Sequence, residues 1–121
     1  MAADKNKIDH NAGEVMEKML QDEDFILYAC LINADGKRLA EHTSEKNEEN
    51  MASLRSSVHE LTSEYPREGL NRAFIEDERG TIAVYRVLDD MFLLTVAEQG
   101  SPLGAVSMNA GKLVEELENR T

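Results

Sequence analysis

Residues 25–32 form an unbroken apolar run, FILYACLI, and this run limits the possible folds more than any other feature of the sequence. Successive side chains of a β-strand point to opposite faces of the sheet, so a strand made of this run is apolar on both faces. The run is far shorter than the ~20 residues that a membrane-spanning helix needs. We therefore expect an interior strand in a sheet that helices cover on both sides.

Four more strands are predicted from the residues and turns that follow. The turn sequence at 33–36, NADG, leads into a half-polar strand over residues 37–42 and completes a hairpin. Strands are predicted at 71–76, 81–88 and 91–98, because β-branched and aromatic residues fill these segments and short Asp- and Gly-containing turns separate them. Short turns join antiparallel strands, so these three strands should form a meander.

Three amphipathic helices are predicted where apolar residues recur at helical spacing: from about 9 to 21, from 51 to 65, and from 103 nearly to the C-terminus. Tyr65 precedes Pro66 and ends the second helix, since a residue before proline is disfavoured in the α region. Ser101 and Pro102 are the expected N-cap and first-turn residues of the third helix.

The expected fold class is therefore α+β, a three-layer sandwich with the element order α-β-β-α-β-β-β-α around a five-stranded antiparallel sheet. The 121 residues suit one domain, 1–121, whose first eight residues we expect to be a flexible N-terminus.

Charge and targeting features exclude several kinds of partner. The chain has 24 acidic and 13 basic residues, which gives a formal net charge of −11 divided almost evenly between its two halves. Nucleic acids and anionic membranes attract clustered basic residues, so we expect neither nucleic-acid binding nor membrane insertion. No apolar leader is present, and Cys30 in the apolar run is expected to be a buried, reduced thiol. These features favour a cytoplasmic protein.

The sequence contains no motif typical of catalysis or of a cofactor or metal site. His10, His42 and His59 lack the spacing of metal ligands. A glycine-rich phosphate loop and a nucleophile elbow are also missing from the sequence. The acidic clusters fall at predicted turns, where carboxylates ordinarily solvate loops. We expect a protein that is not an enzyme, binds no metal and needs no cofactor.

The predicted helix 51–65 has a second, unusual face beside its apolar core stripe. Small residues line this face, namely Ala52, Ser53, Ser56, Ser57 and Ser63. Arg55 and His59 flank them, whereas a helix that only needs to be soluble more often carries Glu and Lys there. A solvated serine-rich face is the alternative to a helix-to-helix contact, which we prefer.

The predicted strand 71–76 follows the crossover formed by this helix, which places it at a sheet edge. The segment Arg72–Glu76 has no proline and no central charge to block pairing with another strand. Self-pairing across a twofold axis would bury the edge and align the two middle helices. The strand and the helix together predict a homodimer with a continuous sheet.

Two segments resemble the roadblock family, the dynein light-chain roadblock type domain that also occurs as stand-alone bacterial and archaeal proteins. They are the first hairpin, ACLINADGKRLA at 29–40, and the start of the third helix, SPLGAV at 101–106 leading to KLVEEL at 112–117. The resemblance extends from about Val15 to Leu117. It implies a roadblock- or profilin-like sandwich with the middle helix on one face of the sheet and the terminal helices on the other. Ser107 and Met108 depart from the many members that have a basic residue here.

The resemblance also implies which residues form an interface. By position, the dimer or partner surface comprises Met51, Ala52, Arg55, Ser56, His59, Ala73, Phe74, Ile75 and Glu76. Family members are usually non-enzymatic platforms: some bind and regulate Ras-like small GTPases, as in bacterial polarity control, and others are dynein subunits.

The leading hypothesis is a homodimeric adaptor that binds a small Ras-like GTPase and modulates its nucleotide cycle or its location. Arg55 is a candidate finger for phosphoryl transfer, although an interface or solvent-exposed arginine is the simpler interpretation. Two alternatives stay open. One is a small-molecule sensor with a pocket among Tyr28, Met108 and apolar neighbours. The other is a structural scaffold in a larger complex, such as a dynein-type assembly.

Overall fold

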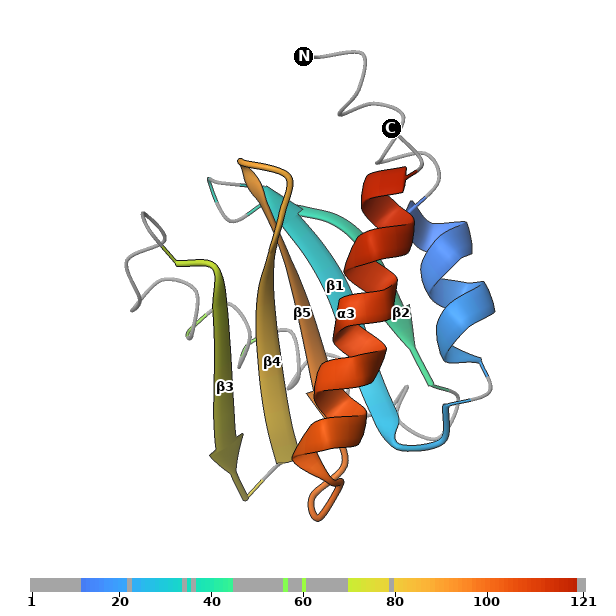
Figure 1. Cartoon of the computed structure of the whole chain (residues 1–121), viewed down its shortest axis with the longest axis vertical. Coiled ribbons are helices and arrows are strands. Elements are labelled where there is room, and N and C mark those ends of the chain that lie inside the picture. The colour runs from blue at the N-terminus through green and yellow to red at the C-terminus, as the bar shows by residue number, and fades with distance from the viewer. Residues whose placement is uncertain are drawn as a thin grey trace.

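The computed structural model describes residues 12–21, 23–33, 35, 37–44, 56, 60, 70–78 and 80–119, and its centre is one antiparallel sheet. The strands are β1 (Ile26–Asn33), β2 (Arg38–Thr43), β3 (Arg72–Asp77), β4 (Gly80–Val87) and β5 (Met91–Ala97). Their order across the sheet is β2-β1-β5-β4-β3, so β1 is interior, β5 is in the middle and β3 is at an edge (Figure 1). All five predicted strands are confirmed, each to within one residue at either end.

Two helices lie side by side on one face of this sheet (Figure 1). Residues 12–20 form the N-terminal helix, and α3 (Leu103–Asn119) is the C-terminal one. Both helices were expected from their apolar spacing. The helix expected at 51–65 lies outside the described residues except for Ser56 and Glu60, which are helical and exposed.

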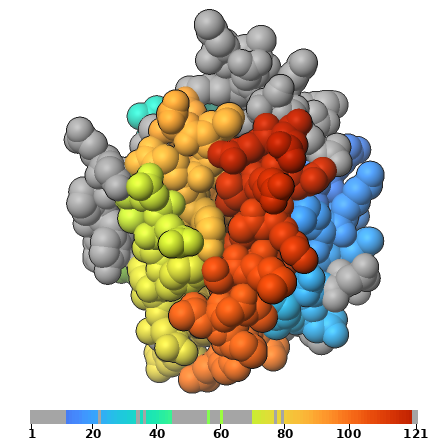
Figure 2. All heavy atoms as spheres, in the orientation of Figure 1, coloured from blue at the N-terminus to red at the C-terminus, as the bar shows by residue number. Residues whose placement is uncertain are grey.

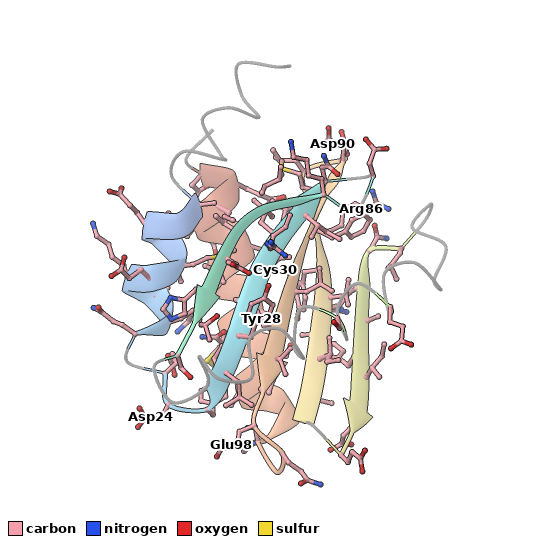
Figure 3. The ribbon with its side chains drawn as sticks, turned by 180° about the vertical axis from the view of Figure 1, so that it is seen from behind. Asp24, Tyr28, Cys30, Arg86, Asp90 and Glu98 are labelled. Carbon is pink, nitrogen blue, oxygen red and sulfur yellow. The ribbon has the colours of Figure 1, made fainter. Side chains whose placement is uncertain are left out.

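Each face of the sheet has its own buried apolar cluster. The helix-side cluster joins the two helices to the sheet and includes Met16, Leu31, Leu93 and Leu113. The opposite cluster contains Tyr28, Cys30, Ile32, Ile82, Val84, Phe92, Leu94 and Val96. Figure 3 shows Tyr28 and Cys30 on the side of β1 turned away from α3. The apolar run is therefore buried on both faces, as its pattern predicts.

The predicted capping at the start of α3 is wrong in detail. The Ser101 hydroxyl donates a hydrogen bond to the Glu98 carbonyl at 2.6 Å and so closes the turn after β5. The carbonyl of Pro102 accepts hydrogen bonds from the N–H groups of Ala105 and Val106 at 3.0 and 3.1 Å. Pro102 therefore occupies the N-cap position, one residue later than expected, because the serine side chain is already used in the turn.

Candidate functional site

The outer side of β3 is the feature most suited to binding another chain. Arg86 N–H donates to the Asn71 carbonyl at 2.8 Å, so Asn71 and Arg86 form a hydrogen-bonded pair of the antiparallel β3–β4 ladder. Since hydrogen-bonded pairs alternate along an antiparallel ladder, Arg72, Phe74 and Glu76 direct their backbone N–H and C=O groups away from β4. Within the part of the chain that the structure describes, no strand pairs with this side. The strand therefore offers a template for one more strand.

The side chains of β3 anchor it from both faces. Ala73 and Ile75 pack against the cluster that contains Tyr28. On the other face Phe74 meets the Tyr85 ring edge-on, with 5.8 Å between ring centroids and 86° between ring planes. The Tyr85 hydroxyl lies 3.2 Å from Ser107 Oγ on α3. These contacts hold β3 to the rest of the sheet from both faces.

Arg72 and Glu76 flank Phe74 on the same face of β3, because alternate residues of a strand point the same way. Both side chains are exposed, and neither forms an ion pair with a described residue. The edge thus presents one cation, one aromatic ring and one anion in a row.

Arg86 fixes the point at which the chain enters β3, a role that the sequence did not suggest. Its Nε donates to the Leu70 carbonyl at 2.8 Å, and an η nitrogen donates to the Asp89 carbonyl at 2.6 Å. The guanidinium carbon lies 4.9 Å from the centroid of the Phe92 ring, a cation–π contact. Figure 3 shows Arg86 near the β4–β5 turn, at the end of the sheet where β3 begins. An arginine inside an otherwise apolar predicted strand was the available signal.

Five of the nine expected interface residues can be placed. Ala73, Phe74, Ile75 and Glu76 lie together on β3, at the edge position that the sequence predicts. Ser56 is helical and exposed. The other four lie outside the described residues: Met51, Ala52, Arg55 and His59.

The expected sensor pocket between Tyr28 and Met108 is wrong. Tyr28 is 1% exposed and belongs to the cluster on the sheet face opposite α3, whereas Met108 on α3 is 63% exposed. The sheet separates the two side chains, since α3 packs on the other face. Alternation along β1, which turns Tyr28 away from the helices, is the physical reason.

Polar contacts link the buried Tyr28 of β1 to two side chains of β2. The Tyr28 hydroxyl donates a hydrogen bond to Glu41 Oε2 at 2.7 Å, and Arg38 Nε lies 3.4 Å from the same oxygen. Burial raises the pKa of the Tyr28 phenol and raises the pKa of the Cys30 thiol to about 12. Since the thiolate is the reactive form of cysteine, Cys30 is unsuited to act as a nucleophile near neutral pH.

His42 is the described member of the three histidines. It lies half-buried on β2, and burial lowers the pKa of its imidazole. Across the described ranges, no group of three His, Cys, Asp or Glu side chains is arranged to hold a metal ion. In the same ranges, no helix is both long and apolar enough to cross a membrane.

Comparison with known proteins finds solved structures that have a similar fold. No protein-family model matches the sequence, and no curated protein matches it. The gliding protein MglB from Thermus thermophilus superposes with a TM-score of 0.72 at 20% identity, covering 93% of this chain and 90% of that one. A structure of MglB with a tetrameric arrangement gives a TM-score of 0.72 at 20% identity, covering 93% of this chain and 89% of that one.

A Roadblock/LC7 domain from Streptomyces avermitilis superposes with a TM-score of 0.62 at 17% identity, covering 88% of this chain and 94% of that one. The expected resemblance to roadblock domains is thus confirmed at the level of the fold: the described residues have a roadblock fold.

Proposed function

We propose that this chain is a homodimeric, non-enzymatic adaptor that binds a small Ras-like GTPase and modulates its nucleotide cycle or its location. The observation that carries the proposal is the edge of β3, where Arg72, Phe74 and Glu76 direct their backbone hydrogen-bonding groups outward. The roadblock fold supports it, since the sequence resemblance implies that family members dimerise through this strand and the helix before it.

The chemistry of the edge suits pairing with a second copy in one register. Outward-facing residues must pair with each other, so an antiparallel pair centred on Phe74 uses all three and forms about six backbone hydrogen bonds. In this register Arg72 lies opposite Glu76 of the partner subunit, and the reverse pair forms at the other end. Opposite charges directly across a strand pair contribute about 0.2–1 kcal/mol each, whereas registers shifted by two residues lose them and two or more hydrogen bonds.

A disulfide test examines the dimer and its register together. In this pairing the two Phe74 Cα atoms lie about 5.5 Å apart, within the roughly 4.4–6.8 Å that a disulfide spans. Phe74→Cys should therefore give a covalent dimer under mild oxidation. The matched control, Arg72→Cys, should not, because the two copies of residue 72 lie roughly 14 Å apart. The native Cys30 is buried in both variants.

Light scattering of the unmodified protein separates the possible outcomes. A monomeric mass at micromolar concentration would refute the homodimer. A dimeric mass with faster cross-linking at residue 72 than at residue 74 would refute the register and leave the dimer.

The dimer would act on a GTPase by holding the partner's mobile loops in one conformation, which requires different affinities for its GTP- and GDP-bound states. The acidic chain, with a net charge of −11, suits a partner that presents a basic patch. Such an association should weaken as salt rises, because ions screen exposed charges.

The discriminating experiment is an affinity pull-down from the native host with GTP or GDP analogues added. Recovery of a small GTPase that depends on the nucleotide, followed by changed hydrolysis or exchange with purified components, would support a regulator. Recovery independent of nucleotide, with both rates unchanged, would favour the scaffold. If no GTPase is recovered and a purified candidate does not co-elute, the GTPase proposal fails.

A further inference from the structure

On the face of the sheet that carries the two helices, β3 lies beside α3, and neither of the described helices covers it (Figure 1). Figure 2 shows this face, with the atoms of β3 and β4 at the surface next to those of α3. Phe74 of β3 and Tyr85 of β4 are half-buried here, and their rings meet edge-on. Because a helix with its side chains is about 10–12 Å across, α3 forms a step above this aromatic floor.

The side of α3 that faces β3 is the wall of this step. The Tyr85 hydroxyl lies 3.2 Å from Ser107 Oγ in the first half of the helix. In its last turn Glu118 Oε2 accepts a hydrogen bond of 2.8 Å from Leu88 N–H in the β4–β5 turn. Gly111 lies between these contacts at helical spacing and so shares their side of α3. A Cβ on Gly111 would meet nothing within 4 Å, so the middle of the wall is open.

The proposed homodimer turns two such steps into one trough. Pairing of the two β3 strands makes a floor with the strand order β4-β3-β3-β4, and the α3 helix of each copy forms a wall. Neighbouring strands lie about 4.8 Å apart, so the two β4 strands are roughly 14 Å apart. Since α3 packs mainly on β4 and less on β5, the two α3 axes are roughly 14–19 Å apart. Packed helices have axes about 8–10 Å apart, so this width admits one helix between the walls.

We propose that this trough binds one amphipathic helix of a partner protein per dimer. Because the trough forms only between two copies, it rests on the homodimer proposed above and not on the GTPase partner. A helix satisfies its own backbone hydrogen bonds, whereas a strand on the floor would find no free edge once the β3 strands pair. The apolar face of the helix contacts Phe74 and Tyr85 of both copies. The twofold axis passes through the middle of the trough, so the two copies share a single helix.

Charge at the ends of the trough specifies the helix further. The contact between Leu88 and Glu118 brings the β4–β5 turn against the last turn of α3, and Asp89 and Glu115 are exposed at this end. On the floor Arg72 is matched by Glu76 of the partner subunit in the proposed register. Twofold symmetry repeats the acidic rim at the other end of the trough. The bound helix should therefore have an apolar middle and Lys or Arg near both ends.

Selection from a phage-displayed peptide library tests the trough, with the full chain as the target. The library presents helix-forming peptides of about 14 residues, which match the roughly 20 Å length of β3, with one helix face and both ends randomised. Enriched peptides should carry Leu, Met or Phe at helical spacing and Lys or Arg at both ends. Fluorescence anisotropy of a labelled enriched peptide then gives the affinity, and binding should saturate at one peptide for two chains.

Gly111→Trp and Gly13→Trp are a matched pair of variants. A Cβ meets nothing within 4 Å at either glycine, and Gly13 belongs to the N-terminal helix, which lies on the other side of α3 from β3. Gly111→Trp fills the trough and should weaken binding by roughly tenfold or more, whereas Gly13→Trp should leave the affinity unchanged. Circular dichroism should show the same fold for both. Equal losses for the two variants, or saturation at one peptide per chain, would overturn the proposal.

Light scattering of the unmodified chain separates failure of the trough from failure of the proposed function. A monomeric mass would refute the homodimer and the trough with it. A dimeric mass without any enriched peptide would refute the trough alone and leave the β3 tests above unaffected. A tetramer that Gly111→Trp converts to a dimer would also overturn the proposal, since a second dimer would then occupy the trough.

Discussion

Gly80 is the first residue of β4 and pairs with Asp77 at the end of β3, and we predict that Gly80→Ala strongly destabilises the protein. The glycine has φ +137°, a backbone conformation that residues with a Cβ rarely adopt. A Cβ built here would lie 1.9 Å from the Ala97 carbonyl oxygen and 3.1 Å from its carbonyl carbon. Both contacts are with the backbone of β5, which cannot rotate aside as a side chain would.

Two separate costs make up the expected loss. Holding alanine in this conformation costs about 1–3 kcal/mol. Relieving the clash separates β4 from β5 at this end and breaks or strains ladder hydrogen bonds, at about 1–3 kcal/mol for each buried group left unsatisfied. Together the two costs amount to about 2–6 kcal/mol, a large share of the about 6–18 kcal/mol expected for a domain of this length.

Thermal and urea denaturation of Gly80→Ala and Gly111→Ala test this reasoning side by side. A Cβ at Gly111 meets nothing within 4 Å, and the residue is inside α3, so alanine there should stabilise by about 0.5–1 kcal/mol. The two substitutions add the same methyl group and should move Tm in opposite directions, down by about 10–20 °C and up by about 2–4 °C. A Gly80→Ala protein that unfolds within 2–3 °C or so of the unmodified chain would refute the clash argument.

Three further predictions concern single side chains. Leu88 is 37% exposed in the β4–β5 turn and has φ +55°, a backbone conformation that asparagine adopts more readily than leucine. Leu88→Asn should therefore raise the free energy of unfolding, measured in urea, by about 1 kcal/mol; an unchanged or lower value would contradict this. Cys30, with its pKa raised to about 12, should resist iodoacetamide at pH 8 in the folded protein and react fully in urea, and rapid labelling without urea would argue against the buried thiol. Burial lowers the pKa of His42, so the unfolded chain binds more protons and stability should fall as pH drops below about 7; His42→Asn should reduce this slope, and identical slopes would show that another group is responsible.

Local patterns of the sequence were sufficient to predict most elements of this fold. The apolar run places β1 inside the sheet, and the turns after β1, β3 and β4 are encoded by their own residues. The edge position of β3 also follows from the sequence, because a crossover precedes it and a meander follows it. These features depend on residues that are close together in the chain, so they can be predicted from a single sequence.

Other features depend on contacts between distant residues and could not be predicted. Strands β1 and β5 are both apolar on both faces, so no pattern distinguishes which of them occupies the middle. The sensor pocket was predicted from the apolar character of Tyr28 and Met108 without knowing which face each would occupy. The interaction of Arg86 with Leu70 and Phe92 links three segments of the chain.

The middle position of β5 has a consequence for how the chain folds as it is made. The strand pairs with β1 on one side and β4 on the other, so it is the only link between the N-terminal hairpin and the rest of the described sheet. During synthesis the hairpin leaves the ribosome long before residues 91–97 do. Until then β1 has an unpaired edge and uncovered apolar faces, so we expect the hairpin to stay incompletely folded and prone to aggregation. Truncation before residue 91 should therefore yield no folded fragment, and a chaperone that shields residues 26–33 would be most useful in that interval.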